Sequence, residues 1–175
     1  MMDAYECLMS KLDVRDFDSD KSVLPDIKLR ILEAARFTGS GMNAQHWRFI
    51  LVTRERLKTL ADDSTTGKWV EGANFAVVVL TEEKYGFQLI DAGRAVQDMQ
   101  IAAWNFGRAS CIFAGVDKNA FRKDFAVPEN LVPSVVVGFG YPSKRILGKT
   151  KNRKPLTELA YINSFAHRFE EQKLS

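Results

Sequence analysis

Apolar residues gather along the chain in short continuous runs, which are separated by longer stretches with helical spacing of apolar positions. The runs predict four strands, over residues 47–52, 75–80, 110–113 and 135–139. They are rich in valine, isoleucine and phenylalanine, which is typical of strands buried in a sheet. Four helices are predicted between them, over residues 25–37, 54–62, 87–106 and 118–125. Asp117 is placed to cap the last of these helices.

The helix over residues 25–37 has the clearest start and end signals. Pro25 suits the first helical position, and Asp26 places negative charge at the positive end of the helix. One face is predicted to be buried because apolar side chains recur on it, namely Ile27, Ile31, Ala34 and Ala35. The helix should end at residues 38–41, where two glycines allow a sharp turn and a close approach to the backbone.

Residues 87–106 form the longest predicted helix, and Gly107 supplies its stop. Apolar side chains occupy most of its faces rather than a single stripe. Small residues would let another helix approach closely, namely Ala92, Gly93, Ala95, Ala102 and Ala103. We therefore expect a central helix that is buried partly in its own domain and partly in a partner subunit.

Strands and helices alternate along the sequence, which favours an α/β (α+β) fold with a single mixed sheet flanked by helices. The chain of 175 residues carries no internal repeat or linker, so residues 1–175 are predicted to form one domain. The last strand should close at Gly140-Tyr141-Pro142. Residues 168–173 are expected in a final short helix or tail.

Positive charge is concentrated in one segment. The net charge is +3, yet six basic residues and no acidic residue lie between Pro142 and Thr157. They are Lys144, Arg145, Lys149, Lys151, Arg153 and Lys154. The rest of the chain has 19 basic against 22 acidic residues, so the excess is local and indicates a local anion.

Composition argues against several classes of protein. The N-terminal residues lack the pattern of a signal peptide, and the longest apolar runs are too short to cross a bilayer. Two cysteines cannot build a disulfide framework, and Cys111 lies in an apolar run, where packing is its expected role. Two histidines without a cysteine cluster supply no dedicated metal site. We expect a cytoplasmic protein without a metal and without membrane contact.

Three polar or glycine-marked segments differ from the apolar framework, namely residues 11–17, 38–47 and 149–155. The first and last supply four cations that could hold a phosphate dianion from several directions: Lys11, Arg15, Lys151 and Arg153. The middle segment supplies Asn43 and Gln45, whose amides both donate and accept hydrogen bonds and so suit the edge of a heterocycle. Taken singly, each residue has a simpler interpretation as solvated charge, turn residue or, for Trp47, core.

The order of these motifs resembles that of the nitroreductase-like FMN-dependent oxidoreductases. The matching segments of this chain read KLDVRDF, TGSGMNAQHWRF, DAGRAVQDMQIAAWNFG, SCIFAGVD, VVVGFGYP and KNRKPL. The family pattern is R-R-S-x-R-x-F, P-S-x-x-N-S-Q-P-W-x-F, a D-A-G helix, a strand that ends near E-G or G-G, G-Y-P, and R-K-P-L. The resemblance spans residues 11–156, and the N-Q-x-W and G-Y-P…R-K-P-L elements are its most specific parts.

The resemblance implies a nitroreductase-like fold and a set of residues for FMN. Lys11 and Arg15 match basic residues that meet the flavin phosphate and pyrimidine side, while Lys151 and Arg153 match residues that also reach the phosphate. The other implied contacts are Leu12, Asp13, Thr38, Gly39, Ser40, Asn43, Gln45, Ile112, Ala114 and Gly115.

For two of these sets of residues, the resemblance implies a position relative to the flavin ring. Residues 38–40 match a stretch that lies along the isoalloxazine and is contributed by the other subunit, which implies a homodimer with the flavin site at the subunit interface. The backbone of Ala114 and Gly115 matches a strand end that faces flavin N5. The implied reaction is ping-pong hydride transfer from NADH or NADPH, through FMN, to a nitroaromatic, quinone or similar planar small-molecule acceptor.

The chain departs from the family pattern at several positions. Leu12 and Asp13 replace a basic residue and a serine, and Gly39 and His46 each replace a proline. The segment between residues 80 and 87 is short, where longer relatives carry helices that help to roof the active site.

Other interpretations remain. Within the family these are reductive dehalogenation, flavin modification, or flavin binding without turnover. A hydrolase triad of Ser40, His46 and Asp91 lacks the G-x-S-x-G turn, and no G-x-G-x-x-G follows a strand as a Rossmann site requires. Nucleic-acid binding through residues 144–154 has no aromatic platform or recognition helix to support it, so no nucleic-acid partner is expected.

Overall fold

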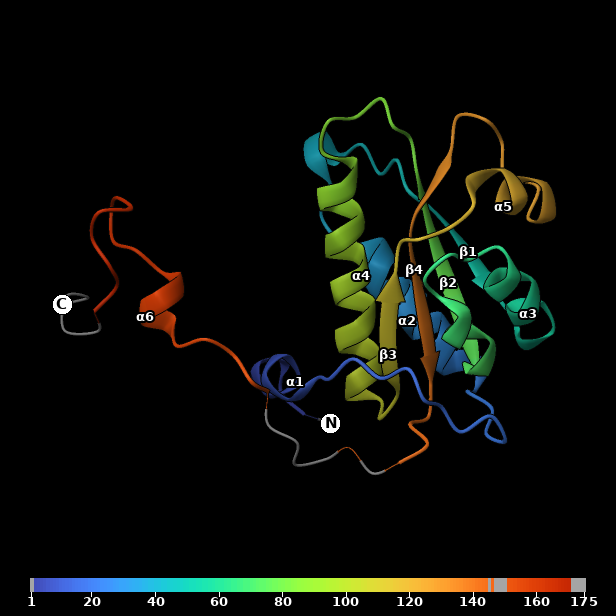
Figure 1. The fold of residues 1–175 in the computed structure, drawn as a ribbon, viewed down its shortest axis with the longest axis horizontal. Coiled ribbons are helices and arrows are strands. Elements are labelled where there is room, and N and C mark those ends of the chain that lie inside the picture. Colours follow the sequence, from blue (N-terminus) through green and yellow to red (C-terminus); the bar gives the residue numbers. More distant parts are fainter. Residues whose placement is uncertain (1, 145, 147–150, 171–175) are drawn as a thin grey trace.

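The computed structural model describes residues 2–144, 146 and 151–170. One sheet lies at its centre, with strands in the order β1-β2-β4-β3 (Figure 1). The strands are β1 (Arg48–Val52), β2 (Phe75–Thr81), β3 (Ala109–Phe113) and β4 (Val132–Gly140). All seven residues of β2 are buried, so side chains cover the sheet on both faces.

Helices pack around this sheet, except for α6, which lies apart from it (Figure 1). They are α1 (Ala4–Ser10), α2 (Pro25–Phe37), α3 (Arg54–Asp62), α4 (Gln88–Asn105), α5 (Lys118–Asp124) and α6 (Leu156–Leu159), with the 3-10 helices η1 (Gly41–Asn43) and η2 (Lys68–Gly72). Alternate side chains of β2 point to opposite faces. Phe75 packs in one apolar layer with Ile31 of α2 and Met99 of α4. Val78 packs in the other, with Leu57 of α3 among its members.

The four predicted strands and the four predicted helices are confirmed. The helices over 25–37 and 54–62 have the predicted bounds, and the other six elements differ by one to three residues at their ends. Pro25 occupies the start of α2, and the Asp117 side chain caps α5 by accepting from two backbone N–H groups. Gly107 follows α4 with φ 69°, the left-handed conformation that suits glycine at a helix stop.

The fold class is confirmed, but the sheet is not mixed. All three strand pairs are antiparallel, and the parallel pairing that the structure describes is a single bridge between Asp13 and Ser110. The expectation came from strands that alternate with helices. Here β4 inserts between β2 and β3, so each strand runs against its neighbours.

Two short helices were not predicted. α1 has seven residues and buries one of them, Cys7, so it lacks a repeating apolar face. Its signal was the capping box formed by Asp3 and Glu6. At the other end, α6 begins after Pro155. Of the short helix or tail expected over 168–173, residues 168–170 are not helical, and residues 171–173 lie outside the described residues.

Helix α4 is the central helix that the sequence predicts. Ala92, Ala95 and Ala103 are buried in the same apolar layer as the core residues of α2, which explains the use of small residues there. Gly93 is exposed, and the part of the chain that the structure describes places nothing within 4 Å of a Cβ built on it.

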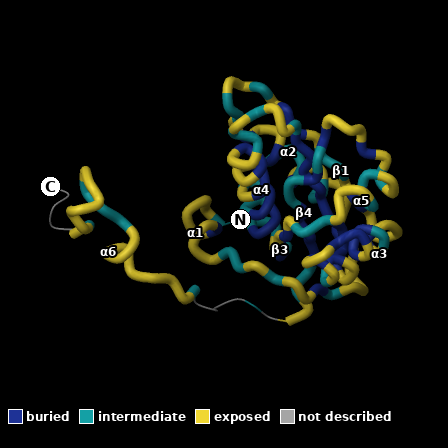
Figure 2. Tube along the Cα trace, turned by 45° about the horizontal axis from the view of Figure 1, so that its top comes forward, coloured by how far each residue is buried: buried dark blue, intermediate teal, exposed yellow. Residues whose placement is uncertain are grey.

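Residues 151–170 form an arm that extends away from the sheet and its helices (Figures 1 and 2). Three of its large apolar side chains are exposed, namely Leu156, Leu159 and Phe165. The rings of Tyr161 and Phe165 stack with centroids 4.1 Å apart, so the arm has local structure of its own.

A buried carboxyl group, that of Asp63, lies at the end of α3. Its Oδ2 atom has no hydrogen-bond partner among the described residues, and the residue is 6% exposed. Burial raises the pKa of Asp63, and the nearby Asp124, Asp117 and Asp62 raise it further. Because the folded state holds this proton more tightly than the unfolded state does, ionised Asp63 lowers the free energy of unfolding above the raised pKa. This reduction in the free energy of unfolding disappears as the pH falls through the ordinary pKa range of aspartate.

We predict that Asp63→Asn raises the free energy of unfolding by about 1 kcal/mol at pH 7, because it removes a buried charge. At about pH 4 and below, where both proteins are neutral at this position, the difference should vanish. Urea unfolding at the two pH values measures both effects. The control is Asp20→Asn, since this carboxylate is exposed and is not among the charges that raise the pKa of Asp63. Equal stabilisation at both pH values would contradict the account.

Candidate functional site

The opening segment is held by a polar network against α4 and β3. The Lys11 ammonium donates to Asp13 Oδ1 at 2.9 Å and to Gln100 Oε1 at 3.1 Å. The Gln100 amide donates to Asp13 Oδ1 at 3.1 Å and to the Ser110 hydroxyl at 3.0 Å. Gln100 is 3% exposed, so its amide has to be satisfied inside the protein. These bonds fix Lys11 and Asp13 beside the edge strand β3.

Sequence reasoning missed Gln100 and Ser110. The available signal was a polar amide on α4, a helix whose neighbouring positions are apolar. A buried amide in such a helix marks a place where another polar group must come close.

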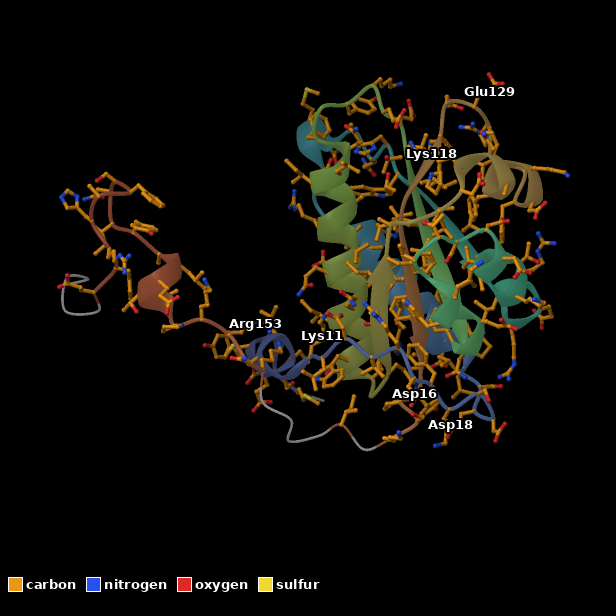
Figure 3. The ribbon with its side chains drawn as sticks, viewed as in Figure 1. Lys11, Asp16, Asp18, Lys118, Glu129 and Arg153 are labelled. Carbon is orange, nitrogen blue, oxygen red and sulfur yellow. The ribbon has the colours of Figure 1, made fainter. Side chains whose placement is uncertain are left out.

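Positive charge from the other end of the chain reaches this segment. The Lys151 ammonium donates to the Leu8 carbonyl at 2.7 Å, which ties the base of the arm to α1. Burial lowers the pKa of Lys151, and the charges of Lys11 and Arg153 lower it further. Figure 3 shows Lys11 directly after α1 and Arg153 close to α1 at the start of the arm. The structure thus brings together three of the four predicted phosphate ligands, which we call the cation cluster: Lys11, Lys151 and Arg153.

The cation cluster has the electrostatic character of an anion site. Three like charges that depress the pKa of one member repel one another, and a bound anion relieves that repulsion. The nearby Asp13 carboxylate acts against this effect, because its negative charge raises the pKa of Lys151. Asp13 also forms an ion pair with Lys11. Three cations and one carboxylate leave a net charge of two, which suits a phosphate dianion.

Arg15, the fourth predicted ligand, has a different environment. Its Nε donates to the Cys111 sulfur at 3.5 Å, and this hydrogen bond is the main cause that raises the pKa of Arg15. Residues 12–16 line a cavity of about 430 Å³ together with residues 142–144 and Ile146. Arg15, Leu12 and Asp13 therefore border a space next to the cation cluster, with Arg15 on the Cys111 side of β3.

The loop over residues 38–47 lies elsewhere, against α4. The Thr38 hydroxyl hydrogen-bonds Asp98, and the Gly41 N–H donates to Asp91 Oδ2 at 2.9 Å. Asn43 and Gln45 are exposed, and the Gln45 amide donates to Asn43 Oδ1 at 3.2 Å. The two amides that the sequence singled out are thus adjacent and accessible. Gly39 is exposed and Ser40 is half-buried in the same loop.

His46 and Asp91 form a buried pair, with Nε2 of His46 3.2 Å from Oδ2 of Asp91. Nδ1 of His46 has no hydrogen-bond partner among the described residues, and the Ser40 hydroxyl instead accepts from the Gln45 N–H at 3.0 Å. A hydrolytic triad requires a histidine bonded to both serine and carboxylate. The geometry therefore disfavours a triad of Ser40, His46 and Asp91. Trp47 is buried, which agrees with its simpler interpretation as a core residue.

The end of β3 brings in two hydroxyl groups that the sequence did not indicate. The Thr65 N–H donates to the Gly115 carbonyl at 2.9 Å. A Cβ built on Gly115 would lie 2.4 Å from the Thr66 hydroxyl and 2.5 Å from the Thr65 hydroxyl, so a larger residue here would have to displace these side chains. Ile112 is 42% exposed one residue before the end of β3, and Ala114 lines a separate cavity of about 250 Å³.

Helix α4 separates the loop from the cation cluster. Asp91 and Asp98 are seven residues apart and share one face of the helix, whereas Gln100 is nine residues from Asp91, about 180° around the axis. The loop over 38–47 therefore binds one side of α4, and Lys11 with Asp13 binds the other. A single chain does not bring all predicted flavin contacts to one place.

The described residues contain no helix that is both long and apolar enough to cross a membrane. They also contain no group of three or more histidine, cysteine, aspartate or glutamate side chains arranged to hold a metal ion.

Comparison with known proteins gives a consistent result. The sequence pattern of the Nitroreductase family matches residues 8–74 and 61–141. A candidate NADH dehydrogenase/NAD(P)H nitroreductase of Archaeoglobus fulgidus is 30% identical over 153 residues, which cover 81% of this chain and 87% of that protein.

Solved structures share the fold. An FMN-dependent nitroreductase of Clostridium difficile superposes with a TM-score of 0.83 at 22% identity, over 92% of this chain and 99% of the other. A candidate nitroreductase of Desulfovibrio desulfuricans in complex with FMN gives 0.80 at 24% identity, over 94% and 99%. Because the family pattern covers most of the chain, the protein belongs to the nitroreductase family.

Proposed function

We propose that this protein is an FMN-dependent NAD(P)H oxidoreductase. The observation that carries the proposal is the cation cluster. The Lys151 ammonium donates to the Leu8 carbonyl at 2.7 Å, and this contact brings Lys151 and Arg153 near Lys11, beside a strand edge that the family motif assigns to flavin. The names of the relatives support the cofactor and the electron donor, since they specify FMN or NAD(P)H.

The residues present fit FMN. Lys11, Lys151 and Arg153 would hold the phosphate. Gly115 is half-buried, with the Thr65 and Thr66 hydroxyls packed against one side of it, and its backbone would lie beside the flavin ring. When bound, FMN supplies hydride transfer from NADH or NADPH to a nitroaromatic, quinone or similar planar acceptor in a ping-pong sequence. The protein's own part is to bind, orient and exclude water, which requires no dedicated acid or base.

The site is completed by a second copy of the chain. Loop 38–47 and the cation cluster lie on opposite faces of α4, so Asn43 and Gln45 would serve the flavin of the other subunit. The arm supports the same arrangement, because Leu156, Leu159 and Phe165 expose apolar surface that the described part of this chain leaves uncovered. We therefore propose a homodimer with the flavin at the subunit interface.

The proposed function is tested by the visible absorption spectrum of protein incubated with FMN and freed of unbound flavin. We expect a retained yellow flavin that NADH or NADPH bleaches in the absence of air, and that a quinone or nitroaromatic recolours. Retained flavin that neither nicotinamide bleaches would contradict the oxidoreductase and favour binding without turnover. A colourless protein would contradict the cofactor itself.

The role of Lys151 can be tested separately from the fold. Lys151→Gln should weaken FMN binding about tenfold, because it removes one charge from the phosphate site, and should leave riboflavin binding unchanged. Lys154→Gln is the matched control, since Lys154 is an exposed lysine of the same segment that lies near Glu158. Calorimetric titration with both flavins measures the effect. Equal weakening of FMN and riboflavin would show that Lys151 does not act on the phosphate.

Asp13 should oppose the phosphate. Asp13→Asn removes a carboxylate that neutralises Lys11, yet keeps an oxygen that can accept from Gln100. We predict that FMN binds several-fold more tightly, on the order of three- to tenfold, with riboflavin unchanged. Weaker FMN binding in this variant would mean that Asp13 is needed to orient Lys11.

A further inference from the structure

Three residues of loop 38–47 adopt a backbone conformation that L-amino acids rarely take. Met42, Asn43 and Gln45 have φ of 52°, 52° and 45°, and none of them is glycine. Residues in this left-handed region persist only where surrounding contacts fix them. Because Asn43 and Gln45 are exposed, their own side chains cannot provide that restraint through burial. Hydrogen bonds within the loop supply part of the restraint, since the Gln45 N–H donates to the Ser40 hydroxyl at 3.0 Å and the Gln45 amide donates to Asn43 Oδ1 at 3.2 Å. Contacts with α4 supply the rest.

Asp91 provides it from α4. Its Oδ2 atom accepts from the Gly41 N–H at 2.9 Å and lies 3.2 Å from Nε2 of His46. Since a carboxylate can only accept, Nε2 carries the proton of this hydrogen bond. One oxygen thus ties the residue before the strained stretch and the residue after it. The His46 and Asp91 side chains are 0% and 3% exposed, so water does not compete for these bonds.

Aromatic side chains surround the His46 ring, and its hydrogen bond is with Asp91. Its ring lies 4.9 Å from that of Tyr85 and 5.8 Å from those of Trp47 and Phe87, between centroids. Nδ1 has no hydrogen-bond partner, so the bond to Asp91 is the directional contact that the structure describes for this imidazole. Packing therefore fixes the ring, and Asp91 fixes its orientation.

The rest of the loop follows the same face of α4. Arg94 lies 4.0 Å from Asp91 Oδ1, and a Cβ built on Gly39 would be 2.7 Å from its guanidinium. Thr38 hydrogen-bonds Asp98, one further turn along. Asp91, Arg94 and Asp98 together determine the path of the backbone from residue 38 to residue 46.

We propose that Asp91 and His46 are positioning residues that hold Ser40, Asn43 and Gln45 in a strained, ready-formed conformation toward flavin. This inference rests on the proposed function. His46 stands where the family pattern has proline, a residue that restricts the backbone covalently. In this chain, a buried imidazole–carboxylate hydrogen bond supplies the restriction instead.

Two substitutions of His46 separate the hydrogen bond from packing. His46→Phe keeps an aromatic ring among Trp47, Tyr85 and Phe87 but removes the donor. His46→Gln keeps a donor near the position of Nε2. Hydrogen–deuterium exchange of residues 38–47, without flavin, reports the anchor directly. Calorimetric titration with FMN, and the rate at which NADH or NADPH reduces the bound flavin, report its consequence.

We expect His46→Phe to speed exchange in the loop and to weaken FMN binding, each by about tenfold, as the loss of one hydrogen bond to a charged group predicts. His46→Gln should restore both to near wild-type values. Leu57→Ala is the control for a general loss of stability, because Leu57 is buried in α3 in the other apolar layer. It should leave loop exchange and FMN affinity unchanged.

The outcomes distinguish the two proposals. Loop exchange in His46→Phe that equals wild type overturns the anchor, whatever the flavin result. Faster exchange with unchanged FMN binding overturns the positioning role. Wild-type protein that binds no FMN overturns the proposed function and the positioning role with it, while exchange in the two His46 variants still decides the anchor.

Discussion

Helix α4 carries two polar side chains that cannot reach water, Asp91 and Gln100, and their burial requires partners inside the protein. Gln100 finds them in Lys11, Asp13 and Ser110. Asp91 finds them in the Gly41 N–H and His46. The hydrogen-bonding needs of these two buried side chains therefore position both candidate functional segments, residues 11–17 and residues 38–47. It also keeps them apart, because the two side chains project from opposite faces of the helix.

This separation connects the fold to the proposed chemistry. A phosphate site needs several cations in one place, and the arm returns Lys151 and Arg153 to Lys11 although about 140 residues separate them along the chain. Recognition of a heterocycle needs amides in fixed positions. Asn43 and Gln45 could supply them from the loop over 38–47, which binds the face of α4 opposite Gln100. In the proposed homodimer, two copies of the chain would combine these halves. Dimerisation would then be a requirement of the proposed site.

Much of this arrangement could be predicted from sequence. Periodicity located the four strands and the main helices, and motif order indicated the cation cluster before any contact was known. Pairing direction could not be predicted, because hydrophobic runs do not specify which strand inserts between β2 and β3. Gln100, Thr65 and Thr66 were missed for a related reason: their importance comes from tertiary neighbours such as Asp13 and Gly115. His46 and Asp91 were noticed as a possible triad, but only the structure showed a buried pair with no serine.

A crystal structure of the protein grown with FMN tests the central claim most directly. The account predicts a dimer in which the flavin phosphate contacts Lys11, Lys151 and Arg153 of one subunit. It also predicts that the ring lies beside Gly115 of that subunit, with the loop 38–47 of the other subunit against it. A phosphate bound away from the cation cluster, or a flavin held entirely within one chain, would contradict the account.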